Sequence, residues 1–207
     1  MFPHKTPVLV QKLYPGLKWR QKTKKKELFL TFDDGPVPGL TPFVLDTLSE
    51  FNIKATFFCV GDNLKKHGEI AQKVVSHGHV LANHTFNHLN GWKTDTDQYL
   101  ENIEKCERYL TEVSTSRRLF RPPYGKMRRS QIRRISQKYE VIMWDVLSGD
   151  FSRKISEESC LSNSIKATHN GSIVLFHDNI KAEKNLKYTL PRYIEHFISQ
   201  GFAFKTL

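Results

Sequence analysis

The chain alternates short, almost wholly apolar runs with longer amphipathic runs, and this alternation limits its fold more than any other feature. Strands of a parallel sheet are apolar almost throughout because helices cover both of their faces, and each parallel connection needs a crossover. The apolar runs predict strands at 28–32, 55–60, 79–83, 141–145, 172–176 and 202–205. The amphipathic runs predict helices at 41–51, 63–76, 96–111, 130–139, 157–167 and 185–199. The sequence therefore predicts an α/β fold.

Length and composition predict a single domain. The 207 residues contain no Gly/Ser linker and no repeat, and the hydrophobic share of 39% is ordinary for a soluble globular protein. The number of strand–helix pairs predicts an open or closed barrel, in which catalytic groups lie where strands end and loops begin. We expect residues 27–207 to form this domain and residues 1–26 to precede it as an extended, basic N-terminal arm.

The net charge of +11 is concentrated in two stretches. Residues 1–26 contain eight Lys and Arg and no acidic residue, and residues 113–139 contain nine more, also without an acidic residue. A solvated surface explains both stretches. The alternative is attraction to an anionic partner, such as a phosphate-bearing or lipid-linked substrate or a membrane face. No nucleic acid is expected, and the oligomeric state stays open.

Cysteine usage and the N-terminal sequence bear on the compartment. Cys59, Cys106 and Cys160 are an odd number at wide spacings, which argues against a disulfide framework and against a zinc knuckle. The first fifteen residues lack the continuous apolar segment of a secretory signal, and no run is long enough to span a membrane. The sequence as written therefore predicts a cytoplasmic protein; a start codon further upstream, restoring an export signal, is the alternative.

Polar clusters follow four of the predicted strands directly, and a fifth lies in a predicted loop. Because the carboxyl ends of parallel strands meet at one edge of a barrel, we expect these clusters to lie close together. They are Asp33-Asp34-Gly35-Pro36, His84-Thr85-Phe86-Asn87-His88, Asp145 with Asp150, His177-Asp178, and Arg121-Pro122-Pro123-Tyr124-Gly125 in the loop.

Two histidines and two carboxylates in these clusters suit a catalytic metal. His84 and His88, four residues apart, can face the same way on a helical turn, and with one carboxylate they form a three-ligand site that leaves positions open for water and substrate. An isolated pair of this spacing is also compatible with ordinary polar loop residues. Adjacent carboxylates at Asp33 and Asp34 repel each other unless a cation compensates them, so their presence favours the metal site.

Three of the clusters, in this order, resemble the first motifs of the polysaccharide deacetylase family (NodB-homology, carbohydrate esterase family four), and a fourth resembles its last motif. The resemblance extends from about Glu27 to Phe204, nearly everything except the basic arm. It implies a distorted (β/α) barrel and a metal-dependent hydrolase of acetylated glycans. The motifs are Thr31-Phe32-Asp33-Asp34-Gly35, His84-Thr85-Phe86-Asn87-His88, Arg121-Pro122-Pro123-Tyr124-Gly125 and Ile173-Val174-Leu175-Phe176-His177.

The resemblance implies a role for each residue of the first three motifs. Asp34, His84 and His88 would bind a divalent metal, usually zinc in the family, which activates water and polarises the acetamide carbonyl. Asp33 would be the general base, kept ionised by Arg121. The backbone N–H of Tyr124, held by the preceding proline pair, would bind the oxyanion.

His177 would be the general acid, made cationic by a carboxylate. Asp150 resembles the family's partner for this histidine, but it is followed by Phe151 where the family commonly has Trp, so Asp145 is the alternative partner. Leu175 and Trp144 would line the apolar pocket for the acetyl methyl group.

The resulting expectation is removal of N-acetyl groups from N-acetylglucosamine-containing oligo- or polysaccharide. Hydrolysis of O-acetyl esters or of other amides on the same barrel is the first alternative. A basic binding module without catalysis is the second. The sequence does not distinguish chitooligosaccharide, peptidoglycan precursor, xylan or exopolysaccharide as the glycan.

Overall fold

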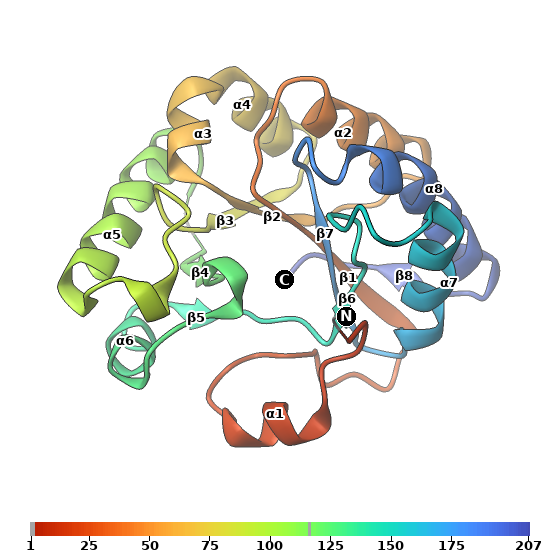
Figure 1. The fold of residues 1–207 in the computed structure, drawn as a ribbon. Coiled ribbons are helices and arrows are strands. Elements are labelled where there is room, and N and C mark those ends of the chain that lie inside the picture. Colours follow the sequence, from red (N-terminus) through yellow and green to blue (C-terminus); the bar gives the residue numbers. More distant parts are fainter. Residues whose placement is uncertain (1–2, 116) are drawn as a thin grey trace.

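The computed structural model describes residues 3–115 and 117–207, and its strands form one curled sheet in which the paired strands run parallel (Figure 1). The order is β5-β4-β3-β2-β1-β7-β6, and β8 pairs with the start of β1. This is the predicted distorted (β/α) barrel. The strands are β1 (Glu27–Asp33), β2 (Thr56–Cys59), β3 (Val80–Asn83), β4 (Leu119–Phe120), β5 (Glu140–Val141), β6 (Val146–Leu147), β7 (Ile173–His177) and β8 (Ala203–Phe204).

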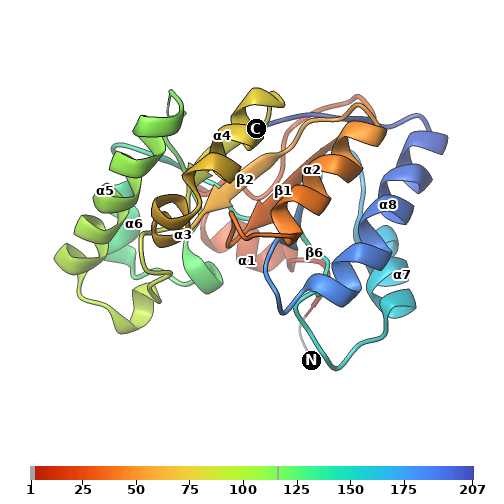
Figure 2. The ribbon, with the colours of Figure 1, turned by 90° about the horizontal axis from the view of Figure 1, so that it is seen from above.

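Helices α2 to α8 surround the sheet on its outer side, as Figures 1 and 2 show. No helix in the described part of the chain is long and apolar enough to cross a membrane. The helices are α1 (Val8–Leu13), α2 (Leu40–Glu50), α3 (Gly61–Lys66), α4 (Gly68–Ser76), α5 (Thr96–Val113), α6 (Arg129–Ile135), α7 (Glu157–Ala167) and α8 (Glu183–Ser199), with single 3-10 turns at Gly91–Lys93 and Pro123–Gly125.

The alternation of side chains along β1 places Asp33, the first of the candidate catalytic residues, inside the barrel. Leu28, Leu30 and Phe32 pack into the core between the sheet and the helices. Phe29 belongs to the smaller apolar cluster inside the barrel. Because successive side chains of a strand point to opposite faces, Asp33 shares the inner face with Phe29.

Two predicted elements are divided in the structure. The helix expected at 63–76 is interrupted at His67, whose backbone (φ −131°, ψ 42°) is not helical, and so becomes α3 and α4. The strand expected at 141–145 is replaced by β5 and β6, which pair with β4 and β7 at the two ends of the sheet. Residues 142–145 connect these two ends, so they cannot continue either ladder. The structure also adds β4, for which no strand was predicted.

The N-terminal arm lies against the gap between β5 and β6. The backbone of Lys18 pairs with Ile142, and Lys5 pairs with Val146. Leu17 and Trp19 are buried in a cluster with residues of α5, α6 and β5. The arm was expected to be extended, but it contains the short helix α1, which begins directly after Pro7.

Candidate active site

Asp33 and Asp34 lie at the end of β1, where the chain turns so that both carboxylates face the same histidine. Asp34 has a φ of 85°, a left-handed conformation that is uncommon for a residue with a side chain. Its carbonyl accepts a hydrogen bond from Asn63 Nδ2 at 2.7 Å, which helps to hold the turn. As a result, Asp33 Oδ2 and Asp34 Oδ1 each lie 3.6 Å from Nε2 of His84.

His84 and His88 lie in the irregular loop after β3, not on the helical turn that their spacing suggested. Positive φ values at Thr85 (64°) and His88 (54°) turn the loop so that both rings face the carboxylates. Nδ1 of His84 lies 2.8 Å from the carbonyl oxygen of Arg121, to which it donates. Burial lowers the pKa of His84 to about 4, against the opposing effect of Asp33, so its Nε2 carries a free lone pair at neutral pH.

Asp34, His84 and His88 meet the requirements of a metal site. Their ligand atoms all lie within 4.8 Å of one another. Oδ1 of Asp34 is buried and accepts no hydrogen bond from the described residues, although Nε2 of His88 lies 3.0 Å away. Burial raises the pKa of Asp34, but His88, His177 and His84 hold it below its usual range, so the group is a carboxylate. Converging lone pairs and a buried carboxylate oxygen without a hydrogen-bond donor fit a divalent cation.

Arg121 lies inside the barrel and pairs with Asp33, as predicted. Its Nη1 donates to Asp33 Oδ1 at 2.7 Å and to Thr31 Oγ1 at 2.8 Å, and its Nη2 donates to the carbonyl of Met143 at 2.9 Å. Its guanidinium lies 4.1 Å from the ring centroid of Phe58. Burial lowers the pKa of Arg121, but a guanidinium with these partners remains cationic and fixes the Asp33 carboxylate.

His177 ends β7 and pairs with Asp150. Nδ1 of His177 lies 2.8 Å from Asp150 Oδ1, and the backbone N–H of His177 donates to Asp150 Oδ2 at 2.7 Å. Burial lowers the pKa of His177, but Asp150 outweighs it and raises the pKa to about 9. The alternative partner, Asp145, accepts instead from the backbone N–H of Ile173 at 2.9 Å. The absence of Trp after Asp150 does not disturb the pair, because Phe151 packs edge-on against the His177 ring at 5.2 Å.

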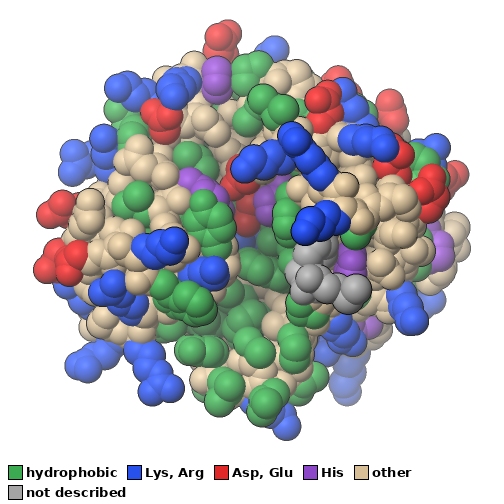
Figure 3. All heavy atoms as spheres, in the orientation of Figure 1, with side chains coloured by type: hydrophobic (Ala, Val, Ile, Leu, Met, Phe, Trp, Pro, Cys, Tyr) green, Lys and Arg blue, Asp and Glu red, His purple; other side chains and the backbone are tan. Residues whose placement is uncertain are grey.

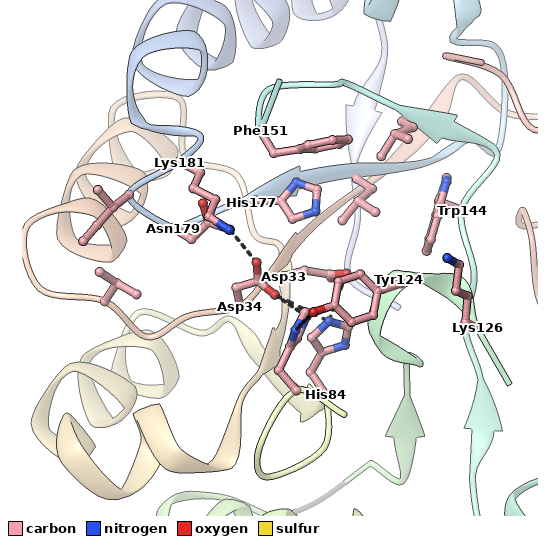
Figure 4. A pocket seen from close by; sticks show the side chains of 15 residues that line it. Asp33, Asp34, His84, Tyr124, Lys126, Trp144, Phe151, His177, Asn179 and Lys181 are labelled. Atoms are coloured by element: carbon pink, nitrogen blue, oxygen red, sulfur yellow. Dashed lines mark hydrogen bonds and ion pairs between the residues drawn. The ribbon is translucent and has the colours of Figure 1, made fainter. Parts of the chain in front are cut away.

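A cleft of about 590 Å³ joins these groups. Figure 4 shows the His177 ring on one side of the two carboxylates and His84 on the other, and Figure 3 shows His and acidic side chains at the bottom of a hollow. The predicted residues Tyr124, Trp144 and Leu175 line this cleft. The ring of Trp144 would clash at 2.8 Å with a Cβ at residue 125, which explains the glycine there.

Three polar residues of the cleft escaped the sequence analysis. Asn179 donates from Nδ2 to the second carboxylate oxygen of Asp34, and Lys126 and Lys181 lie at the rim (Figure 4). Asn179 follows His177 by two residues at a strand end, which was the available signal. The lysines had none, since lysine is common on any protein surface.

Comparison with known proteins agrees with the geometry. A family model described as "Polysaccharide deacetylase" matches residues 20–144. A peptidoglycan-N-acetylglucosamine deacetylase of Bacillus cereus is 36% identical over 74% of this chain and 56% of its own length. A second one from the same organism is 30% identical over 91% of this chain and 90% of its own length.

One solved structure is similar over nearly the whole chain. The peptidoglycan N-acetylglucosamine deacetylase Bc1960, in complex with 4-naphthalen-1-yl-N-oxidanyl-benzamide, superposes with a TM-score of 0.90 at 31% identity. The match covers 98% of this chain and 95% of Bc1960. With the family model, these matches show that the chain belongs to the polysaccharide deacetylase family.

Proposed function

We propose that this protein is a metal-dependent hydrolase that removes N-acetyl groups from N-acetylglucosamine-containing oligo- or polysaccharide. The observation that carries the proposal is the convergence of Asp34, His84 and His88 on one point, next to the buried Asp33 and the cationic His177. The names of the relatives, which specify N-acetylglucosamine in peptidoglycan, support the same class of substrate.

Asp34, His84 and His88 would hold the metal. Two imidazole nitrogens and one carboxylate oxygen are a donor set that suits Zn²⁺ and leaves further positions for water and substrate. When bound, the metal would make water more acidic and polarise the acetamide carbonyl.

The other residues of the cleft supply the proton transfers. Asp33, held in place by Arg121, accepts a proton from the attacking water as the new C–O bond forms. The backbone N–H of Tyr124 donates to the carbonyl oxygen as negative charge develops there. The C–N bond then breaks and His177, charged through Asp150, gives its proton to the leaving nitrogen. The products are acetate and a free amine on the sugar.

The His177–Asp150 pair favours an amide over an ester as the bond that is broken. An amine is a far more basic leaving group than an alcohol, so its departure depends on an acid that is still protonated at neutral pH. A pKa of about 9 for His177 meets that condition.

The rim of the cleft favours a substrate that carries a negative charge. Lys126 and Lys181 lie at this rim, and neither forms an ion pair within residues 3–115 and 117–207. Nζ of Lys126 lies 5.1 Å from the ring centroid of Trp92, which restrains it beside the opening. A glycan with a carboxylate or phosphate group near the acetamido sugar would meet these cations.

Acetate release from a small panel of glycans tests the proposal. We expect zinc-loaded protein to release acetate from N-acetylglucosamine oligosaccharides and from peptidoglycan fragments, and to act poorly on O-acetylated xylan. The Asp33→Asn variant, which keeps the three metal ligands, should bind zinc and release no more than about one thousandth as much acetate. Faster hydrolysis of the xylan ester than of every N-acetylated glycan would assign the esterase activity instead.

A further inference from the structure

Helix α1 presents apolar side chains to solvent. Val8, Leu9 and Leu13 are 59%, 70% and 64% exposed. At 100° per residue these three lie with Lys12 on one side of the helix, while Val10 lies outside that arc, next to Leu13, and packs on the core cluster of the arm. Most of the aliphatic surface of this helix is therefore directed outward, whereas a core helix would bury it.

Cations without acidic partners border this apolar face. Arg129 and Arg133 line a groove with Leu13, and Lys12 and Lys22 line the adjoining one. None of these four cations forms an ion pair with any residue that the structure describes. Figure 3 shows the hydrophobic side chains at the bottom of the molecule, continuing upward to the cleft, with Lys and Arg beside them.

We propose that this surface docks the protein on an anionic phospholipid bilayer. Leu9, Leu13 and Val8 would enter the boundary between headgroups and acyl chains, while the surrounding cations meet the lipid phosphates. Because the cleft and α1 are both visible on the face drawn in Figure 3, docking would hold the cleft near the bilayer.

Two other occupants fit this surface less well. A nucleic acid would use the cations but leave the three aliphatic side chains of α1 in water. A second copy of the chain would cover the aliphatic side chains but bring two sets of uncompensated cations together. An anionic bilayer satisfies both parts of the surface.

Vesicle co-sedimentation tests the proposal on the full chain. We expect binding to phosphatidylglycerol-containing vesicles that weakens at high salt and is at least about tenfold weaker on pure phosphatidylcholine. The double variant Leu9→Asp/Leu13→Asp should bind at least about tenfold more weakly, because two apolar side chains lose their burial. Lys12→Glu should weaken binding about fivefold or more.

Matched variants separate docking from general charge or misfolding. Lys73→Glu makes the same charge change on α4, at the opposite end of the molecule in Figure 1, and Ile198→Asp changes an exposed aliphatic residue of α8. Both should bind vesicles like the parent protein, and all variants should keep its melting temperature. Three results would overturn the proposal: no vesicle binding, binding that Leu9→Asp/Leu13→Asp leaves intact, or a concentration-dependent dimer that this variant abolishes while vesicle binding is absent.

Discussion

The guanidinium of Arg121 and the carboxylate of Asp33 form an ion pair inside the barrel, with Nη1 2.7 Å from Oδ1 and both side chains almost completely buried. The pair joins β1 to the loop after β4, so it orients the proposed general base and also connects two distant parts of the sheet.

Replacing Arg121 should therefore reduce stability as well as activity. We expect Arg121→Met to lower the free energy of unfolding by about 3–5 kcal/mol, because it leaves a buried carboxylate unpaired. Arg121→Lys should lie between this variant and the parent protein, since one ammonium cannot replace the planar fork. Urea unfolding measures the change. Arg134→Met, which breaks an exposed pair with Asp97, is the control and should cost less than about 1 kcal/mol.

The His177–Asp150 pair predicts a pH dependence of metal-free protein. The pKa of His177 in the folded state, about 9, lies above its ordinary value of 6.5. The stabilisation from this proton is therefore complete below pH 6.5 and is lost as the pH rises toward 9. In Asp150→Asn the pKa of His177 should fall clearly below 9, because burial is then opposed only by the weaker effects of Asp34 and Asp33. NMR titration of the imidazole measures it.

The control for this titration is Asp145→Asn, which removes the carboxylate on the other side of β6. Because Asp145 bonds to Ile173 and Ser172 and not to His177, this variant should leave the pKa of His177 near 9. An equal fall in both variants would contradict the assignment of Asp150 as the partner.

Removal of a metal ligand should abolish metal binding without unfolding the chain. We expect one divalent ion per parent chain, and little or none in His84→Ala or His88→Ala after dialysis, because two remaining ligands bind weakly. Elemental analysis of the purified proteins measures the content. His196→Ala, which changes a histidine on α8 far along the chain from the cluster, should retain the full content.

Removing the buried hydroxyl should have opposite effects on stability at Tyr99 and at Tyr193. Tyr99 is fully buried and its hydroxyl bonds to no residue within 3–115 or 117–207, whereas the hydroxyl of Tyr193 lies 2.7 Å from Thr168 Oγ1. We expect Tyr99→Phe to be neutral or to raise the free energy of unfolding by about 1 kcal/mol, and Tyr193→Phe to lower it by about 1 kcal/mol. A loss of stability in Tyr99→Phe would reveal a polar partner for that hydroxyl.

The sequence predicted the parts of the fold whose local pattern and tertiary role agree. The apolar runs of β1, β2, β3 and β7 are strands because both of their faces are covered. The run 141–145 is equally apolar, but it connects the two ends of the sheet, and only tertiary structure determines that. The helix α1 was missed because it has only six residues and begins with three consecutive apolar residues, so it shows no helical spacing of apolar and polar positions.

The candidate site could be predicted because its residue types are needed for a reaction and not for the packing of the fold. A purely structural role seldom explains charged residues and histidines at the ends of strands. The structure brings four of them together: Asp34, His84, His88 and Arg121. The choice between Asp145 and Asp150 depended on a distance that no spacing encodes. Asn179 and Lys126 could not be predicted because amides and lysines are common in loops with and without a functional role.

The backbone pairing of the N-terminal arm has a consequence for how the enzyme could respond to attachment. Lys5 pairs with Val146 and Lys18 pairs with Ile142, at the two ends of the segment that links β5 to β6. Helix α1 lies between these two lysines in the sequence. A ligand that holds α1 would therefore also restrain residues 142–146, which link the two ends of the sheet. Since Trp144 lies in this segment and lines the cleft, a protein anchored through α1 should present a more rigid cleft wall than one free in solution.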